Sequence, residues 1–288
     1  MSSRPRTNMS SPALARVVEL VVHRGTQRVL DGVSETLCQG EVVVIMGENG
    51  SGKTTLIEAF AGLIPLRSGD VIWAENGNSI VVRDSQGRRN QPPSMGLTLQ
   101  KGGVCGDETV MERISVSLSV AGIEHSDDQI MELLSLWGLE HRANDRLAHL
   151  SGGLSRRVAI LGGLAPAALS NSPLVVLLDE PSEGLDDSAK DILSSWIRSL
   201  SSRNHAILIA THDKDISSTA DRVLTIRDGS IEEQIGKSLG DICDLPQSEE
   251  RGNKTPVSSL VKWSLKMEVR NPIAVSYTHL RAHETIPD

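Results

Sequence analysis

Apolar residues occur along much of the chain in short runs bounded by glycine, proline or acidic residues. Because these runs are rich in β-branched side chains, they predict β-strands. They lie at residues 17–22, 41–46, 71–73, 80–82, 95–99, 174–178, 206–210 and 223–226. Two of them, 174–178 and 206–210, are continuously apolar, which is typical of strands buried on both faces of a parallel sheet.

A helical pattern occupies the middle of the chain and the segment between those two buried strands. From about residue 108 to residue 169 the apolar positions recur in steps of three and four, as around Trp137. Residues 188–200 also have helical spacing. A strand, a helix and a second strand with short links predict a parallel βαβ unit, so we expect an α/β fold.

Several conspicuous residues predict structure rather than chemistry. The small residues at 162–167 favour a close approach of two backbones. The tryptophans expected in the core are Trp73, Trp137 and Trp196. The histidines that lack metal-ligand spacing, and that we expect on the surface, are His125, His141, His149 and His205. Arg156 and Arg157 leave two interpretations open, a functional role or a solvated helix face.

Composition narrows the class of protein. Apolar residues make up 39% of 288 residues, enough for a sizeable core, and the formal net charge of −8 argues against a nucleic-acid partner. Three cysteines without short spacing predict neither a disulfide framework nor a zinc site. No uninterrupted apolar stretch reaches about 18 residues, and the polar N-terminus lacks the features of a secretory signal. We therefore expect a cytoplasmic protein.

A glycine-rich segment after the strand at 41–46 carries the first candidate chemistry. Residues 47–54 read Gly-Glu-Asn-Gly-Ser-Gly-Lys-Thr, a P-loop pattern in which backbone N–H groups and a helix N-terminus cradle phosphates. Lys53 would reach the β- and γ-phosphates, and Thr54 would ligate Mg²⁺. The alternative is an ordinary glycine-rich turn. The expected nucleotide-binding residues here are Gly47, Asn49, Gly50, Ser51, Gly52, Lys53, Thr54 and Thr55.

An acidic pair, Asp179 and Glu180, follows the buried strand at 174–178. The carboxyl ends of parallel strands line the crevice where α/β sheets bind ligands. Asp179 would therefore hold Mg²⁺, and Glu180 would act as general base on the attacking water. Taken alone, such a pair is more often a helix N-cap or a solvated turn. The P-loop favours the catalytic interpretation.

Together with further motifs, these residues resemble the ATP-binding-cassette (ABC) ATPases over about residues 16–233. The run Leu150-Ser151-Gly152-Gly153-Leu154 is similar to the family signature, and residues 182–186 are similar to its D-loop. Gln100 resembles the Q-loop glutamine that contacts Mg²⁺, and His212 resembles the switch histidine that contacts the γ-phosphate. The resemblance implies a P-loop NTPase of the ABC type, with a mixed sheet core, a β subdomain and a helical signature subdomain.

The resemblance also implies a head-to-tail dimer that binds ATP and Mg²⁺. Each ATP would lie between the P-loop of one copy and Ser151, Gly152 and Gly153 of a second identical or related chain. The implied catalytic residues are Glu180, His212 and Gln100, and the implied metal ligands are Thr54, Gln100 and Asp179. A transmembrane permease, separate or fused, would hold the ATPase at the inner face of the cell membrane.

Two positions depart from the family pattern. Leu154 replaces the usual glutamine as the fifth signature residue. His23 or Arg24 occupies the position where the family usually has an aromatic residue that stacks on adenine. A histidine ring or a guanidinium could still stack on a base. The second departure therefore puts base selectivity in doubt and leaves the phosphate chemistry untouched.

Beyond the ATPase domain the sequence changes character. The expected segments are a disordered start (1–13), an ATPase domain (14–236) with a helical subdomain at about 106–170, a linker (237–257), a basic amphipathic stretch (258–274) and a non-native tail (275–288). The amphipathic stretch is either a surface helix or the start of a permease, similar to those of export-type and cytochrome c biogenesis (haem-export) ABC transporters. The tail resembles a translated sequencing adapter.

We therefore expect an ATPase that powers transmembrane transport, with export favoured. One alternative is a soluble ABC ATPase that acts in macromolecular assembly or repair. Another is a regulatory nucleotide-binding module without turnover, against which the intact Lys53, Asp179, Glu180 and His212 count.

Overall fold

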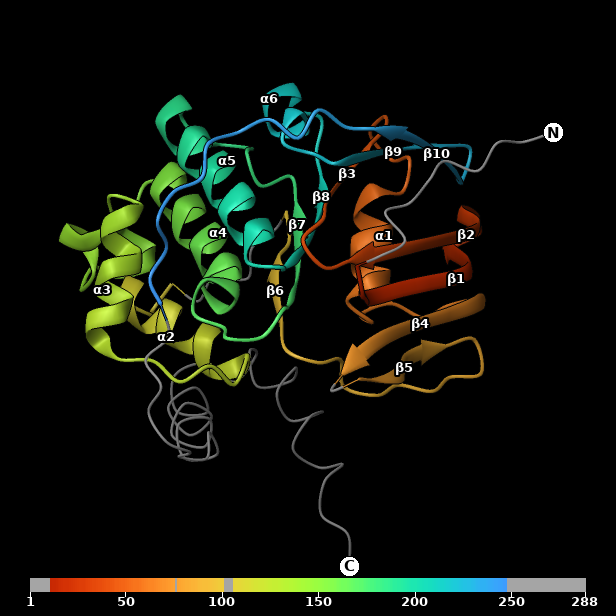
Figure 1. The fold of residues 1–288 in the computed structure, drawn as a ribbon, viewed down its shortest axis with the longest axis horizontal. Coiled ribbons are helices and arrows are strands. Elements are labelled where there is room, and N and C mark those ends of the chain that lie inside the picture. The colour runs from red at the N-terminus through yellow and green to blue at the C-terminus, as the bar shows by residue number, and fades with distance from the viewer. Residues whose placement is uncertain (1–10, 76, 101–105, 248–288) are drawn as a thin grey trace, which may run out of the picture.

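The computed structural model describes residues 11–247, apart from residue 76 and residues 101–105 (Figure 1). The described strands form two sheets. A four-stranded antiparallel sheet has the order β2-β1-β4-β5, built from β1 (Ala13–Arg24), β2 (Gln27–Cys38), β4 (Ser68–Glu75) and β5 (Asn78–Asp84). A six-stranded sheet has the order β10-β9-β3-β8-β7-β6, built from β3 (Val42–Met46), β6 (Met95–Thr98), β7 (Val175–Asp179), β8 (Ala206–Ala210), β9 (Arg222–Arg227) and β10 (Ser230–Ile235). All its pairs are parallel except β9 with β10.

Helices cover both faces of the six-stranded sheet. In Figure 1, α1 (Lys53–Phe60) lies between the two sheets, whereas α4 (Gly152–Ala168) and α5 (Asp187–Ser202) lie on the other face. Helix α2 (Val110–Val120) packs on α4, α3 (Asp127–Leu136) packs on α2, and the short α6 (Lys214–Ser218) follows β8. This arrangement confirms the expected α/β fold with a mixed sheet and a β subdomain. Among the described residues, no helix is both long and apolar enough to cross a bilayer.

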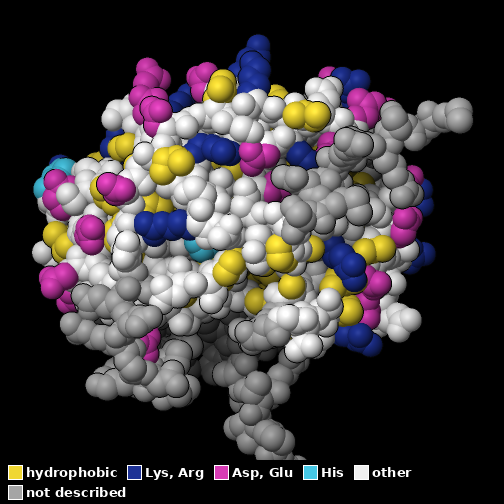
Figure 2. Space-filling view, viewed as in Figure 1, with side chains coloured by type: hydrophobic (Ala, Val, Ile, Leu, Met, Phe, Trp, Pro, Cys, Tyr) yellow, Lys and Arg dark blue, Asp and Glu magenta, His cyan; other side chains and the backbone are white. Residues whose placement is uncertain are grey.

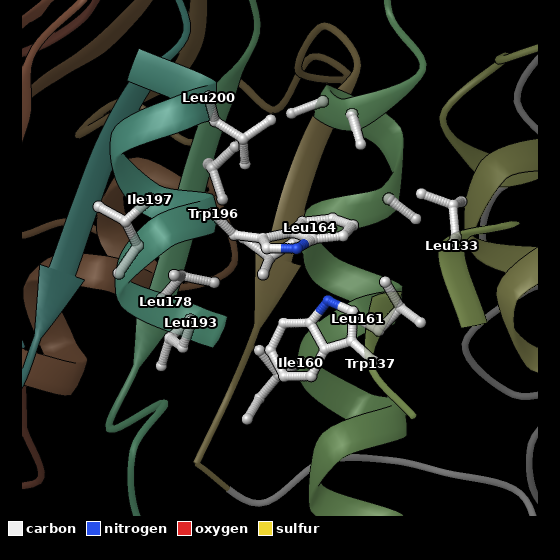
Figure 3. Packing of buried hydrophobic residues seen from close by; sticks show 14 of the residues in the cluster. Leu133, Trp137, Ile160, Leu161, Leu164, Leu178, Leu193, Trp196, Ile197 and Leu200 are labelled. Carbon is white, nitrogen blue, oxygen red and sulfur yellow. The ribbon is translucent and has the colours of Figure 1, made fainter. Parts of the chain in front are cut away.

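The central strands bury alternate side chains in two separate cores. In β3, Val43 packs with α1 and the four-stranded sheet, whereas Val42 packs with α4 and α5. The second core holds Trp137 and Trp196, whose rings meet edge to face with their centroids 5.7 Å apart (Figure 3). Trp73 is buried in the first core. The prediction that these tryptophans are core residues is confirmed.

Helix α4 lies very close to the edge strand β6. A side chain on Gly96 would overlap the carbonyl oxygen of Gly163, and a side chain on Gly163 would overlap the Thr98 hydroxyl. Only glycine permits such a close approach of two backbones. The expectation of close packing at residues 162–167 is thereby confirmed, and the contact fixes α4 against the strand that leads to Gln100.

Strand β2 has no counterpart among the sequence predictions. Its inward-facing residues, Leu30, Val33 and Leu37, are three and four positions apart, which is a helical spacing. The pairing of β1 with β2 contains several register shifts, and Gly32 takes a positive φ of 68°. These bulges reset the side-chain alternation that identifies a strand, so the sequence pattern was misleading here.

Residues 236–247 form no helix or strand, but hydrogen bonds hold them against the domain. The Arg203 guanidinium donates to the carbonyls of Leu245 and Pro246, the latter at 2.9 Å, and the Gln129 amide on α3 donates to the Gln247 carbonyl at 3.2 Å. This part of the expected linker therefore joins α5 to α3 (Figure 1). At the other end, Ala13 begins β1 and is not part of a disordered start. The segments expected at 1–10, 248–257, 258–274 and 275–288 lie outside the described residues.

His205 corrects one sequence prediction, because it is buried and not on the surface. It is 1% exposed at the start of β8, where its Nδ1 accepts a hydrogen bond of 3.0 Å from the Leu174 N–H. An accepting Nδ1 requires a neutral ring. Burial lowers the pKa of His205 to about 4, and the nearby Arg203 charge adds to the effect. This histidine joins the two buried strands at their amino ends.

We expect His205 to make folding stability depend on pH. Between pH 6.5 and pH 4 the unfolded chain protonates this histidine and the folded chain does not, so the free energy of unfolding falls as the pH falls. The slope from this group is about 1.4 kcal/mol per pH unit. The His205→Asn variant keeps a hydrogen-bond acceptor but has no titrating group. Its free energy of unfolding, measured with denaturant, should therefore lose this part of its dependence on pH. An unchanged pH dependence in the variant would contradict the assignment.

Candidate functional site

The P-loop connects β3 to α1 in a conformation that depends on its glycines. Gly47, Gly50 and Gly52 have φ angles of 150°, 83° and 113°, which other residues rarely adopt. Gly52 is the N-cap of α1 and provides no side-chain hydrogen bond to the helix. The backbone N–H groups of the first turn are thus open to a ligand, and the helix dipole favours an anion there.

Two side chains of the loop are arranged for phosphate. Lys53 is 7% exposed, and its ammonium donates to the carbonyls of Gly47 and Glu48 at 2.9 and 3.1 Å, which holds it over the loop. The buried Ser51 hydroxyl has no hydrogen-bond partner among the described residues. A buried donor without a partner is costly, and a phosphate oxygen would satisfy it.

Asp179 ends β7 as a buried carboxylate suited to a cation. It is 0% exposed, and neither oxygen has a hydrogen-bond partner among the described residues. Burial raises the pKa of Asp179, while the nearby Thr54 hydroxyl and Gln100 backbone N–H act in the opposite direction. Carboxylate, hydroxyl and amide oxygens are the ligands that Mg²⁺ prefers. The residues present therefore fit a magnesium ion.

Glu180 and His212 are in direct contact although 32 residues separate them. His212 Nδ1 lies 2.9 Å from Glu180 Oε2, and the His212 backbone N–H donates to the same oxygen at 3.3 Å. Glu180 is 6% exposed and has a φ of +46°, a strained left-handed conformation for this residue. Its backbone N–H donates to the Ala210 carbonyl at 2.7 Å. Strain at a buried acid indicates a functional constraint.

Gln100 is positioned by the D-loop. Its side-chain amide donates to Glu183 Oε2 at 3.0 Å, so the Q-loop and D-loop candidates are linked. The Gln100 backbone lies beside Asp179.

The signature residues lie apart from the P-loop of the same chain. Ser151 is the N-cap of α4 and accepts a hydrogen bond from the Leu154 N–H. Ser151, Gly152 and Gly153 are exposed, and α4 packs on the face of the six-stranded sheet opposite α1. The fold therefore brings together all the predicted site residues except these three.

The structure shows specific contacts for three arginines whose roles the sequence left open. The Arg24 guanidinium bonds to Glu58 and Thr55 of α1, which sets it beside the nucleotide-binding candidates. The Nη2 of Arg157 donates to both carboxylate oxygens of Asp186, the N-cap of α5. Arg156 donates to backbone carbonyls at the ends of β6 and β7. Neither Arg156 nor Arg157 belongs to a merely solvated face.

A P-loop, a buried acid at the end of another parallel strand of the same sheet and a histidine-paired glutamate define a P-loop ATPase. Known proteins make the class more specific. The ABC transporter family model matches residues 30–183. The chain is similar to the lipoprotein-releasing system ATP-binding protein LolD of Granulibacter bethesdensis, with 32% identity over 228 residues, 76% of this chain and 97% of LolD. The chain therefore belongs to the ABC transporter family and is an ATP-binding ATPase.

A second relative is longer than this chain. The macrolide export ATP-binding/permease protein MacB of Psychrobacter cryohalolentis is 33% identical over 210 residues, which cover 72% of this chain and 30% of MacB. This chain thus spans less than a third of that relative. A solved dimeric ATP-binding cassette bound to ADP and Pi has 22% identity and a TM-score of 0.65, covering 77% of this chain and 98% of that one. This structural similarity shows that the two chains share a fold, and no more.

We expect Lys53→Ala to abolish tight binding of ATP, because the variant removes the ammonium group that is held over the loop. Titration calorimetry with ATP should give no measurable heat of binding under conditions where the parent chain binds. Circular dichroism provides the control for folding. Unchanged affinity in the folded variant would refute the P-loop assignment.

Proposed function

We propose that this chain is the ATP-hydrolysing part of an ABC transporter and that two copies, or this chain and a related one, act head to tail to power export. One observation carries the proposal. Asp179, Glu180 and His212 lie at the carboxyl edge of the sheet beside the P-loop, while the exposed signature lies across the sheet. The chain thus has every part of the site except a signature facing its own P-loop.

In this proposal the P-loop holds the phosphates of ATP, with Lys53 neutralising the β- and γ-phosphates. Thr54, Asp179 and Gln100 would hold Mg²⁺, which supplies charge neutralisation on the phosphate oxygens when bound. Glu180 accepts the proton of the attacking water, and its burial and strained backbone hold the carboxylate in one position. His212 fixes one Glu180 oxygen and reaches the γ-phosphate side of the site.

A second copy would complete each site. Ser151, Gly152 and Gly153 lie at the start of α4, where a hydroxyl and backbone N–H groups are suited to phosphate oxygens. ATP between the two chains would hold the dimer closed, and loss of the γ-phosphate would release it. That cycle would move a permease, separate from this chain or fused to it, at the inner face of the membrane.

The relatives support transport over the alternative of a soluble ATPase for assembly or repair. LolD is named for lipoprotein release and MacB for macrolide export. On the face drawn in Figure 2, Lys and Arg side chains alternate with Asp and Glu and do not gather in one basic patch. That face offers no electrostatic footprint for a nucleic acid, as a repair function would require.

The base of ATP would lie against Arg24, because that guanidinium already reaches Thr55 and Glu58 on α1. Successive side chains of a strand point to opposite faces. His23 would therefore point away from the nucleotide, and of the two candidates Arg24 is the one placed to stack.

We expect Glu180→Gln to bind ATP but to hydrolyse it at least about 100-fold more slowly, since the amide cannot accept the proton. Phosphate release measures turnover. Light scattering with ATP should then detect a dimer that the parent chain forms only transiently. Turnover at the parent rate would contradict the role of Glu180.

Mixing two inactive variants tests the head-to-tail arrangement. Lys53→Ala lacks a working P-loop, and Ser151→Arg places a bulky cation where the partner's γ-phosphate would lie. Each alone should be inactive. An equal mixture should recover up to about a quarter of the parent rate, because half of the dimers would contain one intact composite site out of two. Absence of recovery would argue against a site shared between chains.

A further inference from the structure

Arg156 makes a set of contacts that the proposed catalytic roles do not explain. Its Nη1 donates to the carbonyls of Leu99 and Gln100 at 3.2 and 3.3 Å. Its Nη2 donates to the carbonyls of Asp179 and Glu180 at 3.1 and 2.6 Å. One guanidinium therefore bridges the chain after β6 and the chain at the end of β7.

These four carbonyls lie beyond the last residue pair between β6 and β7, although Asp179 still pairs with Ala210 of β8. Strands β6 and β7 are parallel, and their last paired residues are Thr98 and Leu178. A planar guanidinium with several fixed donors can satisfy carbonyls on both sides, which an ammonium cannot do with the same geometry.

The contact falls on the strained residue of the site. Glu180 has a φ of +46°; its N–H donates to the Ala210 carbonyl, and its own carbonyl accepts from the Arg156 Nη2 at 2.6 Å and from the Glu183 N–H at 3.2 Å. Burial of the guanidinium lowers the pKa of Arg156, and the negative charges of Glu183, Asp179 and Glu180 act in the opposite direction. Loss of Arg156 would remove the shorter of the two bonds to the Glu180 carbonyl and leave only the one from Glu183.

Arg156 also belongs to α4, the helix that begins with the exposed signature. The same side chain thus connects the signature helix, the Gln100 backbone and the backbone of the general base. We propose that Arg156 is a positioning residue for ATP hydrolysis, which ties the orientation of Glu180 and Gln100 to that of the signature helix. The inference rests on the proposed function, because it assigns hydrolysis to Glu180.

Arg156→Met in the full chain tests this role, since methionine keeps the apolar stem of the side chain but removes the guanidinium and its four hydrogen bonds. We expect kcat to fall by roughly 10- to 100-fold, the usual effect of a small misplacement of a reacting group. Affinity for ATP, measured by calorimetry, should stay unchanged because Arg156 does not contact the P-loop. The kcat of Arg156→Lys should lie between that of Arg156→Met and that of the parent chain.

Two further variants separate positioning from general damage. Arg142→Met is the matched control, because Arg142 pairs with Asp145 at the exposed surface of the same helical region, and it should retain the parent kcat. In a Glu180→Gln background, Arg156→Met should cause little additional loss of hydrolysis, since both act on one step. A purely structural role would instead lower melting temperature, ATP affinity and kcat together.

The outcomes distinguish this inference from the proposed function. If the parent chain hydrolyses ATP and Arg156→Met does so at the same rate, the positioning role is wrong and the ATPase proposal stands. If the parent chain hydrolyses no ATP, both fail. If Arg156→Met does not fold, Arg156→Lys decides: a lower kcat at unchanged ATP affinity supports the role, and the parent kcat overturns it.

Discussion

The parallel pairing of β7 between β6 and β8 is the constraint on which the site depends. Parallel strands end at the same edge of a sheet, so the residues after these three strands meet there: Gln100, the Asp179–Glu180 pair and His212. Strand β3 pairs with β8 in the same direction and delivers the P-loop to that edge. Backbone hydrogen bonds alone therefore bring four distant segments together. The side-chain contact of Glu180 with His212 is a consequence of this pairing.

The same edge also contains two energetically unfavourable features. Asp179 is buried without a hydrogen-bond partner among the described residues, and Glu180 adopts a left-handed conformation that costs about 1–3 kcal/mol. Only a well-supported sheet can hold such residues. The two cores provide that support, because every residue of β7 and of β8 is buried between helices on one face and α1 with the β subdomain on the other. The well-packed sheet thus tolerates the unfavourable burial of Asp179 and the strained backbone of Glu180 at its end.

The sequence predicts features that depend on residues close together in the chain, and it misses features that depend on contacts between distant residues. The P-loop and the Asp179–Glu180 pair are local patterns, a strand followed by a turn, so their placement at the sheet edge was foreseen. Strand β2 was missed because bulges gave it a helical spacing. His205 was misplaced because a buried acceptor for one backbone N–H has no sequence signature. The partners of Arg156 are carbonyl oxygens, which every residue has, so only the fold could reveal them.

The division of the molecule into two cores also bears on the proposal that two chains act together. Helix α1 and the P-loop belong to the core shared with the four-stranded sheet, whereas α4 belongs to the core on the opposite face. Gly96 and Gly163 lock α4 against β6, so the signature at its start cannot swing across the sheet without separating two closely packed backbones. The exposed Ser151–Gly153 segment therefore faces outward for as long as the domain stays folded. A second chain is then the simplest source of the signature that the P-loop lacks, and Arg156 is the side chain by which binding at that outward surface would reach Glu180.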